Sequence, residues 1–125
     1  MKSCIITFIC LILSCAQDTT IKVELLAPLA FEEKISEDNV QLVDVRTPEE
    51  WQDGIINHAK TINYFDDSFK MQLKELDKTK PVAVYCKSGG RSGKTAKLLS
   101  ELGFKEIYDL KGGYLNWITF KKAAN

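Results

Sequence analysis

Two hydrophobic periodicities alternate along residues 21–120 and predict strands and helices in turn. Short runs rich in β-branched and aromatic residues are typical of strands, and they occur at residues 40–46, 60–64, 81–86 and 105–110. A further run at residues 21–26 is a short strand or an entry segment. Between these runs, apolar residues spaced three and four positions apart predict helices, at residues 27–36, 66–80 and 91–104, from Pro48 and near Tyr114.

This order of elements predicts an α/β fold, a small and mostly parallel β-sheet flanked by helices on both faces. The run VQLVDVR, residues 40–46, has apolar residues at Val40, Leu42, Val43 and Val45, and so on both of its alternating faces. Such a strand is typical of a parallel sheet that is covered on both sides. A chain of 125 residues can form one such core, and we place the domain at residues 21–125.

Two predicted helix ends carry capping residues. Thr47 precedes Pro48, and Glu49 and Glu50 follow in the first turn, where a hydroxyl cap and negative charge are favourable. Gly103 follows the apolar stripe of residues 91–104. Glycine at that place commonly ends a helix, so we expect the helix to stop there.

The first residues, MKSCIITFICLILSCAQ, have the layout of a bacterial secretory signal peptide. Their apolar stretch is shorter than the roughly 20 residues that a membrane-spanning helix needs. Ile12–Cys15 resembles a lipobox, in which the cysteine is acylated and becomes the new N-terminus. We therefore expect a signal peptide at residues 1–14, lipidation of Cys15 and a tether at residues 15–20. The mature protein would be exported, periplasmic and anchored by its lipid to the outer membrane.

Other fates of this segment stay open. Ser14 and Ala16 satisfy the small-residue rule for ordinary cleavage after Ala16, which would release a soluble periplasmic protein. An uncleaved anchor or a buried strand would leave the segment in place. The lipobox and ordinary cleavage both predict export.

Charge and cysteine usage narrow the chemistry. Basic and acidic residues number 17 each, so no basic field exists to hold nucleic acid. Because Cys4 and Cys10 leave with the signal peptide and Cys15 is lipidated, Cys86 stands alone and no disulfide framework is possible. A lone thiol is a small buried hydrophobe or a reactive group. One histidine and one thiol cannot make a metal cluster, so we expect no metal and give His58 a surface or packing role.

The segment VYCKSGGRS, residues 84–92, places Cys86 between a strand and a helix. Gly89 and Gly90 let the backbone curl with its N–H groups inward, which makes an anion-binding nest beside a helix N-terminus. Lys87 and Arg91 add positive charge at the same place. Such surroundings favour the thiolate, so the pattern predicts a nucleophile that solvent and an oxyanion substrate can reach.

Three separated motifs resemble those of the rhodanese family. Residues 86–92 match its active-site loop, C-x-x-G-x-R-S. Residues 44–51, DVRTPEEW, match its D-V-R-x-x-x-E-aromatic element, and residues 110–117, LKGGYLNW, match its L-x-G-G-x-x-x-W closing element. The family's G-H-I-P-G-A element is partly kept at residues 54–59, where the histidine and the second glycine are missing.

The resemblance implies a sulfurtransferase that needs no cofactor. Cys86 would attack the outer sulfur of a small anionic donor such as thiosulfate, hold a persulfide, and pass the sulfane sulfur to cyanide or a thiol, including a thiol of a partner protein. Substrate binding would fall to Lys87, Ser88, Gly89, Gly90, Arg91 and Ser92. Asp44, Arg46 and Glu50 would support the site, with Arg46 paired to Glu50, and we expect a monomer.

Two other functions would use the same residues. A non-catalytic persulfide carrier or partner-binding module would dock another protein through the loop. A cysteine phosphatase or arsenate reductase of similar fold needs five residues between its cysteine and its arginine. Here four residues separate Cys86 from Arg91, so the spacing disfavours phosphate.

Overall fold

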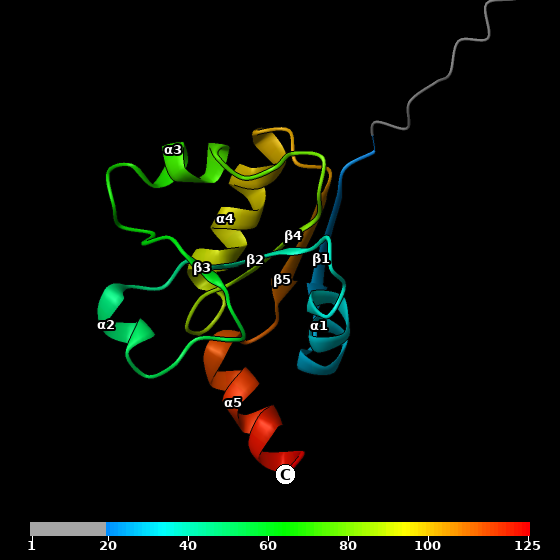
Figure 1. Ribbon diagram of the computed structural model, residues 1–125, viewed down its shortest axis with the longest axis vertical. Coiled ribbons are helices and arrows are strands. Elements are labelled where there is room, and N and C mark those ends of the chain that lie inside the picture. Colours follow the sequence, from blue (N-terminus) through cyan, green and yellow to red (C-terminus); the bar gives the residue numbers. More distant parts are fainter. Residues whose placement is uncertain (1–19) are drawn as a thin grey trace, which may run out of the picture.

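A five-stranded parallel sheet runs through the centre of the domain (Figure 1). The computed structural model describes residues 20–125. The strand order is β1-β5-β4-β2-β3, and each pairing of neighbouring strands is parallel. The strands are β1 (Lys22–Leu26), β2 (Gln41–Asp44), β3 (Lys60–Thr61), β4 (Val82–Tyr85) and β5 (Glu106–Leu110).

Helices alternate with these strands along the chain. They are α1 (Pro28–Ile35), α2 (Pro48–Trp51), α3 (Phe69–Lys74), α4 (Gly90–Glu101) and α5 (Gly113–Ala123). The strand expected at residues 21–26 is β1. The alternation confirms the predicted α/β fold.

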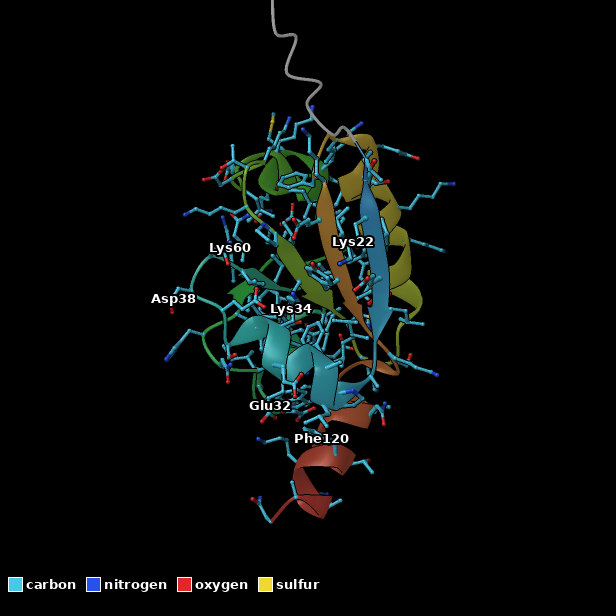
Figure 2. The ribbon with its side chains drawn as sticks, turned by 90° about the vertical axis from the view of Figure 1, so that its right-hand side faces the viewer. Lys22, Glu32, Lys34, Asp38, Lys60 and Phe120 are labelled. Atoms are coloured by element: carbon cyan, nitrogen blue, oxygen red, sulfur yellow. The ribbon has the colours of Figure 1, made fainter. Side chains whose placement is uncertain are left out.

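Consecutive strand residues point into two separate layers of the core, because side chains alternate across a sheet. Val84 of β4 packs in the layer that contains Leu99 of α4. Its neighbour Ala83 lies in the opposite layer, with Phe31 of α1 and Trp117 of α5. Figure 2 shows α1 in front of the sheet and α4 behind it. Helices therefore cover both faces, as predicted.

Two elements are shorter than the periodicity predicts. The helix expected over residues 66–80 is confined to α3. Two aspartates, one before and one after this helix, turn the backbone and limit its length. Asp66 Oδ1 accepts the N–H two residues further on at 2.9 Å, and Asp77 Oδ1 does the same at 2.9 Å. The strand expected over residues 60–64 is reduced to the two residues of β3.

Both predicted helix caps are confirmed. Thr47 is the N-cap of α2: its Oγ1 accepts the Glu50 N–H at 3.4 Å, and the Glu50 carboxylate accepts the Thr47 N–H at 2.8 Å. This is a reciprocal capping box. Gly103 follows the C-cap of α4 with φ of +97°, a conformation that glycine adopts without steric cost.

The predictions for the N-terminus concern residues outside the described part of the chain. The signal peptide and Cys15 belong to residues 1–19, and the description begins at residue 20. Within residues 20–125, no helix combines the length and the apolar character needed to cross a membrane.

The carboxyl ends of β2 and β4 bring two of the sequence motifs together. Asp44 of β2 stands in register with Tyr85 of β4. Arg46 and Cys86 follow these residues and leave the sheet at the same edge. In open α/β sheets this is the edge at which ligands bind.

Helix α5 docks onto the segment after β4 through its first backbone amides. The Tyr114 N–H donates to the Cys86 carbonyl at 2.8 Å, and the Leu115 N–H donates to the Lys87 carbonyl at 3.1 Å. Gly113 permits this approach, with φ of +63°. A Cβ atom there would lie 2.5 Å from Lys87 O and 2.6 Å from Cys86 O. Since these are main-chain atoms, the loop itself would have to shift.

We predict that Gly113→Ala destabilises the domain more than Gly103→Ala does. Both positions have positive φ, which costs a residue with a Cβ atom about 1–2 kcal/mol. At Gly103 nothing lies within 4 Å of the added Cβ, whereas at Gly113 the clash should add roughly 1–3 kcal/mol. Denaturant unfolding of both variants measures the difference. Equal losses of stability would mean that the contact with the loop does not constrain the fold.

Candidate functional site

The backbone between β4 and α4 curls around the sulfur of Cys86. Gly89 has φ of +113° and is the N-cap of α4, and its N–H donates to Cys86 Sγ at 3.1 Å. Ser92, in the first turn of α4, places its Oγ 3.4 Å from the same sulfur. The sulfur therefore lies at the amino end of a helix, where backbone N–H groups and the helix dipole favour an anion.

Cys86 has no exposed surface in this conformation. Its relative exposure is 0%, and it belongs to the core layer on the α4 side of the sheet. The prediction of a solvent-accessible thiol is therefore wrong for this state. The physical reason is that the loop is held closed: the Gly89 N–H binds the sulfur, and α5 binds the carbonyls of Cys86 and Lys87.

Arg91 is bound to a carboxylate of α2. Its Nη1 and Nη2 donate to the two Glu50 carboxylate oxygens, each at 2.9 Å. Chiefly because of this contact with Arg91, the pKa of Glu50 is lowered to about 2. The pair is partly buried, and bidentate geometry of this kind is specific in direction. Arg91 thus ties the start of α4 to α2 and shapes the loop.

Arg46 lies at the centre of a buried network below the loop. Its exposure is 1%, its Nε donates to Asp44 Oδ1 at 3.0 Å, and its Nη2 donates to Asp44 Oδ2 at 2.7 Å. One N–H of Nη1 donates to the Glu50 carbonyl at 3.0 Å, and the second N–H of Nη2 donates to the Gly54 carbonyl at 2.6 Å. The expected ion pair between Arg46 and Glu50 is wrong, because Thr47 and Arg91 occupy the Glu50 carboxylate.

Tyr85 was not among the predicted site residues, yet it completes this network. Its hydroxyl donates to Asp44 Oδ2 at 2.7 Å and accepts the Ile56 N–H at 2.9 Å. Burial is the main cause that raises the pKa of the Tyr85 phenol. A tyrosine in a fully buried strand needs a hydrogen-bond partner for its hydroxyl. The tyrosine in the apolar run PVAVYC therefore indicated a buried polar contact at this end of the strand.

Asp109 was also missed, although an acid inside the apolar strand KEIYDL is an unusual feature. Its exposure is 6%, and its Oδ1 is buried with no hydrogen-bond partner. Its strand neighbours are Val84 and Leu25. Burial raises the pKa of Asp109 to about 6, and the Ser92 hydroxyl opposes the rise. Asp109 therefore lies against the start of α4, where a Cβ atom added to Gly93 would be 3.8 Å from its Oδ2.

A cavity of about 190 Å³ adjoins the loop. Arg46, Glu50 and Lys87 supply polar groups to its wall, together with Asp53. Its apolar wall consists of Tyr114, Leu115 and Ile118, all from α5. This places Lys87 next to a space that a small ligand could enter, while the sulfur itself lies beneath the loop.

The predicted site residues thus separate into two groups. Cys86, Gly89 and Ser92 meet at the sulfur, and the Glu50–Arg91 pair braces them. Lys87, Ser88 and Gly90 are exposed on the outside of the loop, and His58 is exposed elsewhere on the surface. Over residues 20–125, no three histidine, cysteine or acidic side chains are arranged to hold a metal ion.

We predict that Asp109→Asn becomes more stable relative to the wild type as the pH rises. The pKa of Asp109 in the folded protein is about 6, above its usual 3.8, so the folded carboxyl keeps a proton that the unfolded chain has released. The stability that this proton gives is complete below about pH 4 and is lost as the pH rises through about 6. Between these limits the free energy of unfolding of the wild type should fall by up to about 3 kcal/mol, and that of the variant should not show this fall.

Urea unfolding at about pH 4 and about pH 8 measures this effect. Asp38→Asn, at an exposed position, is the matched control (Figure 2). It keeps Asp109, so the difference between its free energy of unfolding and that of the wild type should be the same at both pH values. A difference between Asp109→Asn and the wild type that stays constant with pH would contradict the prediction.

Comparison with known proteins agrees with this geometry. Residues 27–119 match the family model described as "Rhodanese-like domain". The uncharacterized protein YqhL of Bacillus subtilis strain 168 is 42% identical over 77 residues, which cover 62% of this chain and 60% of YqhL. The tRNA uridine(34) hydroxylase of Chlamydia trachomatis serovar L2 is 37% identical over 109 residues, which cover 82% of this chain and 33% of that protein.

Solved structures extend the likeness to the fold. A rhodanese-related protein from Thermoplasma volcanium has a TM-score of 0.69 at 30% sequence identity, covering 78% of this chain and 92% of that one. The chain therefore spans 60% of the length of YqhL and 33% of the length of the hydroxylase, but 92% of the Thermoplasma volcanium structure. The family match over residues 27–119, with the loop and strand ends in the places described above, shows that the chain belongs to the rhodanese-like domain family.

Proposed function

We propose that the protein is a sulfurtransferase that carries sulfane sulfur as a persulfide on Cys86. The observation that carries this proposal is the placement of Cys86 Sγ at the amino end of α4, with the Gly89 N–H at 3.1 Å and Ser92 Oγ at 3.4 Å. The Gly89 N–H donates to the sulfur and stabilises negative charge on it. The Ser92 hydroxyl accepts from the thiol and donates to the Gly89 carbonyl, so it would have to rotate to donate to a sulfur anion. The Cys86 thiolate is the nucleophile that takes up the sulfur, and it is formed again when the sulfur is passed on.

The first step loads the sulfur. The Cys86 thiolate attacks the outer sulfur of thiosulfate or a similar donor, a new S–S bond forms, and the donor's S–S bond breaks. Sulfite leaves with the electron pair of that bond, and Cys86 becomes a persulfide anion. If the cysteine starts as a thiol, its proton passes to solvent.

The second step returns the enzyme to its starting state. Cyanide or a thiolate attacks the terminal sulfur of the persulfide, and the electron pair of the persulfide bond returns to Cys86 Sγ. One covalent intermediate links the two steps, so the kinetics are ping-pong. Lys87, exposed at the wall of the adjoining cavity, lies where it can attract an anionic donor.

Opening of the loop is part of this proposal, because Cys86 is 0% exposed. Lys87 and Ser88 are exposed and lie between β4 and α4, and the Lys87 carbonyl accepts the Leu115 N–H of α5. The sulfur donor would reach Cys86 when this segment moves and the Gly89 N–H releases the sulfur. Loops of few buried contacts are the parts of a domain that open at low free energy.

The burial of Cys86 favours one alternative, a non-catalytic persulfide carrier or partner-binding module. In that case a partner protein would seat itself over the loop and open it. A cysteine phosphatase or arsenate reductase has less support, because Glu50 already holds Arg91 by both carboxylate oxygens. The hydroxylase activity named for the Chlamydia relative belongs to a protein of which this chain covers 33%.

We predict that the protein gains one sulfur atom on Cys86 after incubation with thiosulfate. Intact-mass measurement and a thiosulfate-to-cyanide assay are run on the wild type and on Cys86→Ser. Mass gain and turnover that both vanish in the variant support the sulfurtransferase, and mass gain without turnover supports the carrier. Cleavage of para-nitrophenyl phosphate would support the phosphatase. A native protein whose Cys86 neither gains sulfur nor reacts with iodoacetamide would overturn the proposal.

We also propose export of the protein, with lipidation at Cys15. The described residues begin just before the amino end of β1, whereas Cys86 follows the carboxyl end of β4 in the same parallel sheet (Figure 1). An anchor before residue 20 would therefore leave the site at the end of the sheet that faces away from the membrane.

We predict that membrane-extracted protein has a mass that corresponds to a diacylated N-terminus at Cys15, and that Cys15→Ala abolishes it. Acylation with two chains gives stable anchoring, which one chain does not. A mass that begins at Gln17 would show ordinary cleavage, and a mass that begins at Met1 would contradict cleavage and lipidation at Cys15.

A further inference from the structure

The outer edge of β1 offers backbone groups to a further strand. β1 is the last strand on one side of the sheet, and in the described part of the chain only β5 pairs with it. The Lys22 N–H donates to the Lys105 carbonyl, and the Leu26 carbonyl accepts the Lys111 N–H. Since neighbouring residues of a strand direct their backbone groups to opposite edges, the N–H and C=O groups of Val23 point away from β5.

Three apolar side chains along this edge are exposed to solvent. Ile21 is 47% exposed, Val23 is 50% exposed and Leu25 is 60% exposed. Side chains alternate across a strand, so these three share one face of it. The strand at the opposite edge of the sheet, β3, has two residues, whereas β1 has five. Short edge strands resist pairing with another chain, and long apolar ones favour it. β1 is therefore the edge at which a further strand would add.

We propose that two copies of the protein pair through β1 as an antiparallel dimer whose two-fold axis passes beside Val23. In this register the N–H and C=O groups of Val23 bond to those of Val23 in the second copy. Ile21 lies opposite Leu25 of the second copy, so the exposed apolar side chains cover one another. The two five-stranded sheets become one continuous sheet. Such a dimer goes beyond the proposed function and departs from the monomer expected from the sequence.

The charges of β1 fit a pair of identical strands in this register. Lys22 and Glu24 lie on the other face of the strand, partly exposed and 3.3 Å from one another (Figure 2). About an axis beside Val23, each Lys22 lies opposite Glu24 of the second copy, which gives two symmetric ion pairs. Residues 22 and 24 form the pairs without mutual backbone hydrogen bonds, in which side chains approach most closely. One strand is thus complementary to itself in both shape and charge.

Neighbouring registers lack this complementarity. A pair centred on Lys22 would bring the two copies of that lysine opposite one another, and a pair centred on Glu24 would do the same with two carboxylates. Like charges directly opposite destabilise a strand pair. A register centred between two residues would set the apolar face of one strand against the charged face of the other. The sequence IKVELL, residues 21–26, therefore selects the register about Val23.

The pairing leaves the proposed site free. Cys86 follows β4, which lies two strands inward from β1. Helix α1 packs on β4 and β5 as well as on β1, so it lies over the sheet. The N-termini of the two copies enter at opposite ends of the strand pair. Two lipidated copies would therefore lie with their strands along the membrane, unlike a single anchored chain.

The test reverses the charges one at a time and then combines the variants. Sedimentation equilibrium of the full chain, in detergent whose density is matched by the solvent, measures the protein mass alone. At about 100 μM, which populates a dimer of micromolar Kd, the wild type should have twice the mass of one chain. Lys22→Glu and Glu24→Lys should each weaken self-association at least about tenfold, because each sets like charges opposite one another in both pairs.

An equal mixture of Lys22→Glu and Glu24→Lys should restore the dimer, since opposite charges then meet in both pairs. Restoration also shows that neither variant is merely misfolded. Lys60→Glu, the same reversal on the exposed β3 at the other edge, is the matched control and should keep the dimer (Figure 2). A monomeric wild type, a dimer that both single reversals leave intact, or a mixture that stays monomeric would overturn the proposal.

The dimer and the proposed function can fail separately. Lys22→Glu should take up sulfur from thiosulfate as the wild type does, because β1 lies away from the Cys86 loop. A dimer without sulfur uptake would contradict the sulfurtransferase alone. Sulfur uptake by a wild type that stays monomeric would contradict the dimer alone.

Discussion

The structure depends on one buried guanidinium whose charge has to be balanced. Arg46 is 1% exposed, and removing such a charge from water costs several kcal/mol unless it is paired and hydrogen-bonded. Asp44 supplies the countercharge, and the carbonyls of Glu50 and Gly54 each accept one further N–H group, so four of the five N–H groups are bound. The Tyr114 ring covers the guanidinium, 4.0 Å from its carbon. Strand β2, helix α2, the turn at residue 54 and helix α5 are therefore fixed to one side chain.

This arrangement decides what the neighbouring acid can do. Arg46 uses the main-chain carbonyl of Glu50, so the Glu50 carboxylate stays available for Thr47 and Arg91. Arg91 lies in the first turn of α4, and the N–H of the N-cap residue Gly89 binds the Cys86 sulfur. The position of the sulfur is thus linked to β2 through a series of ion pairs and caps. Each link is partly or fully buried, where ion pairs are sensitive to the loss of one partner.

The sequence allowed the local features to be predicted and left the choice of long-range partners open. The Thr47 cap and the stop at Gly103 depend on residues three or four positions apart, so short-range rules suffice for them. The partner of Arg46 could not be read from spacing, because Asp44 and Glu50 are both close in sequence and only the fold sets their directions. The closure over Cys86 depends on α5, which begins 27 residues later. Asp109 was visible as an acid in an apolar strand, but its contact with Ser92 requires the packing of α4 on β5.

Charge at the mouth of the site is largely balanced between neighbours. Arg46 faces Asp44 and Arg91 faces Glu50, so these guanidinium groups offer little net field to an incoming anion. Lys87 remains exposed beside the cavity, but Asp53 lines the same wall. Recognition of an anionic sulfur therefore falls mainly to fixed backbone donors such as the Gly89 N–H, which binds Cys86 Sγ. Such donors act at short range and in one direction, which suits an atom bonded to Cys86 better than a free anion in solution.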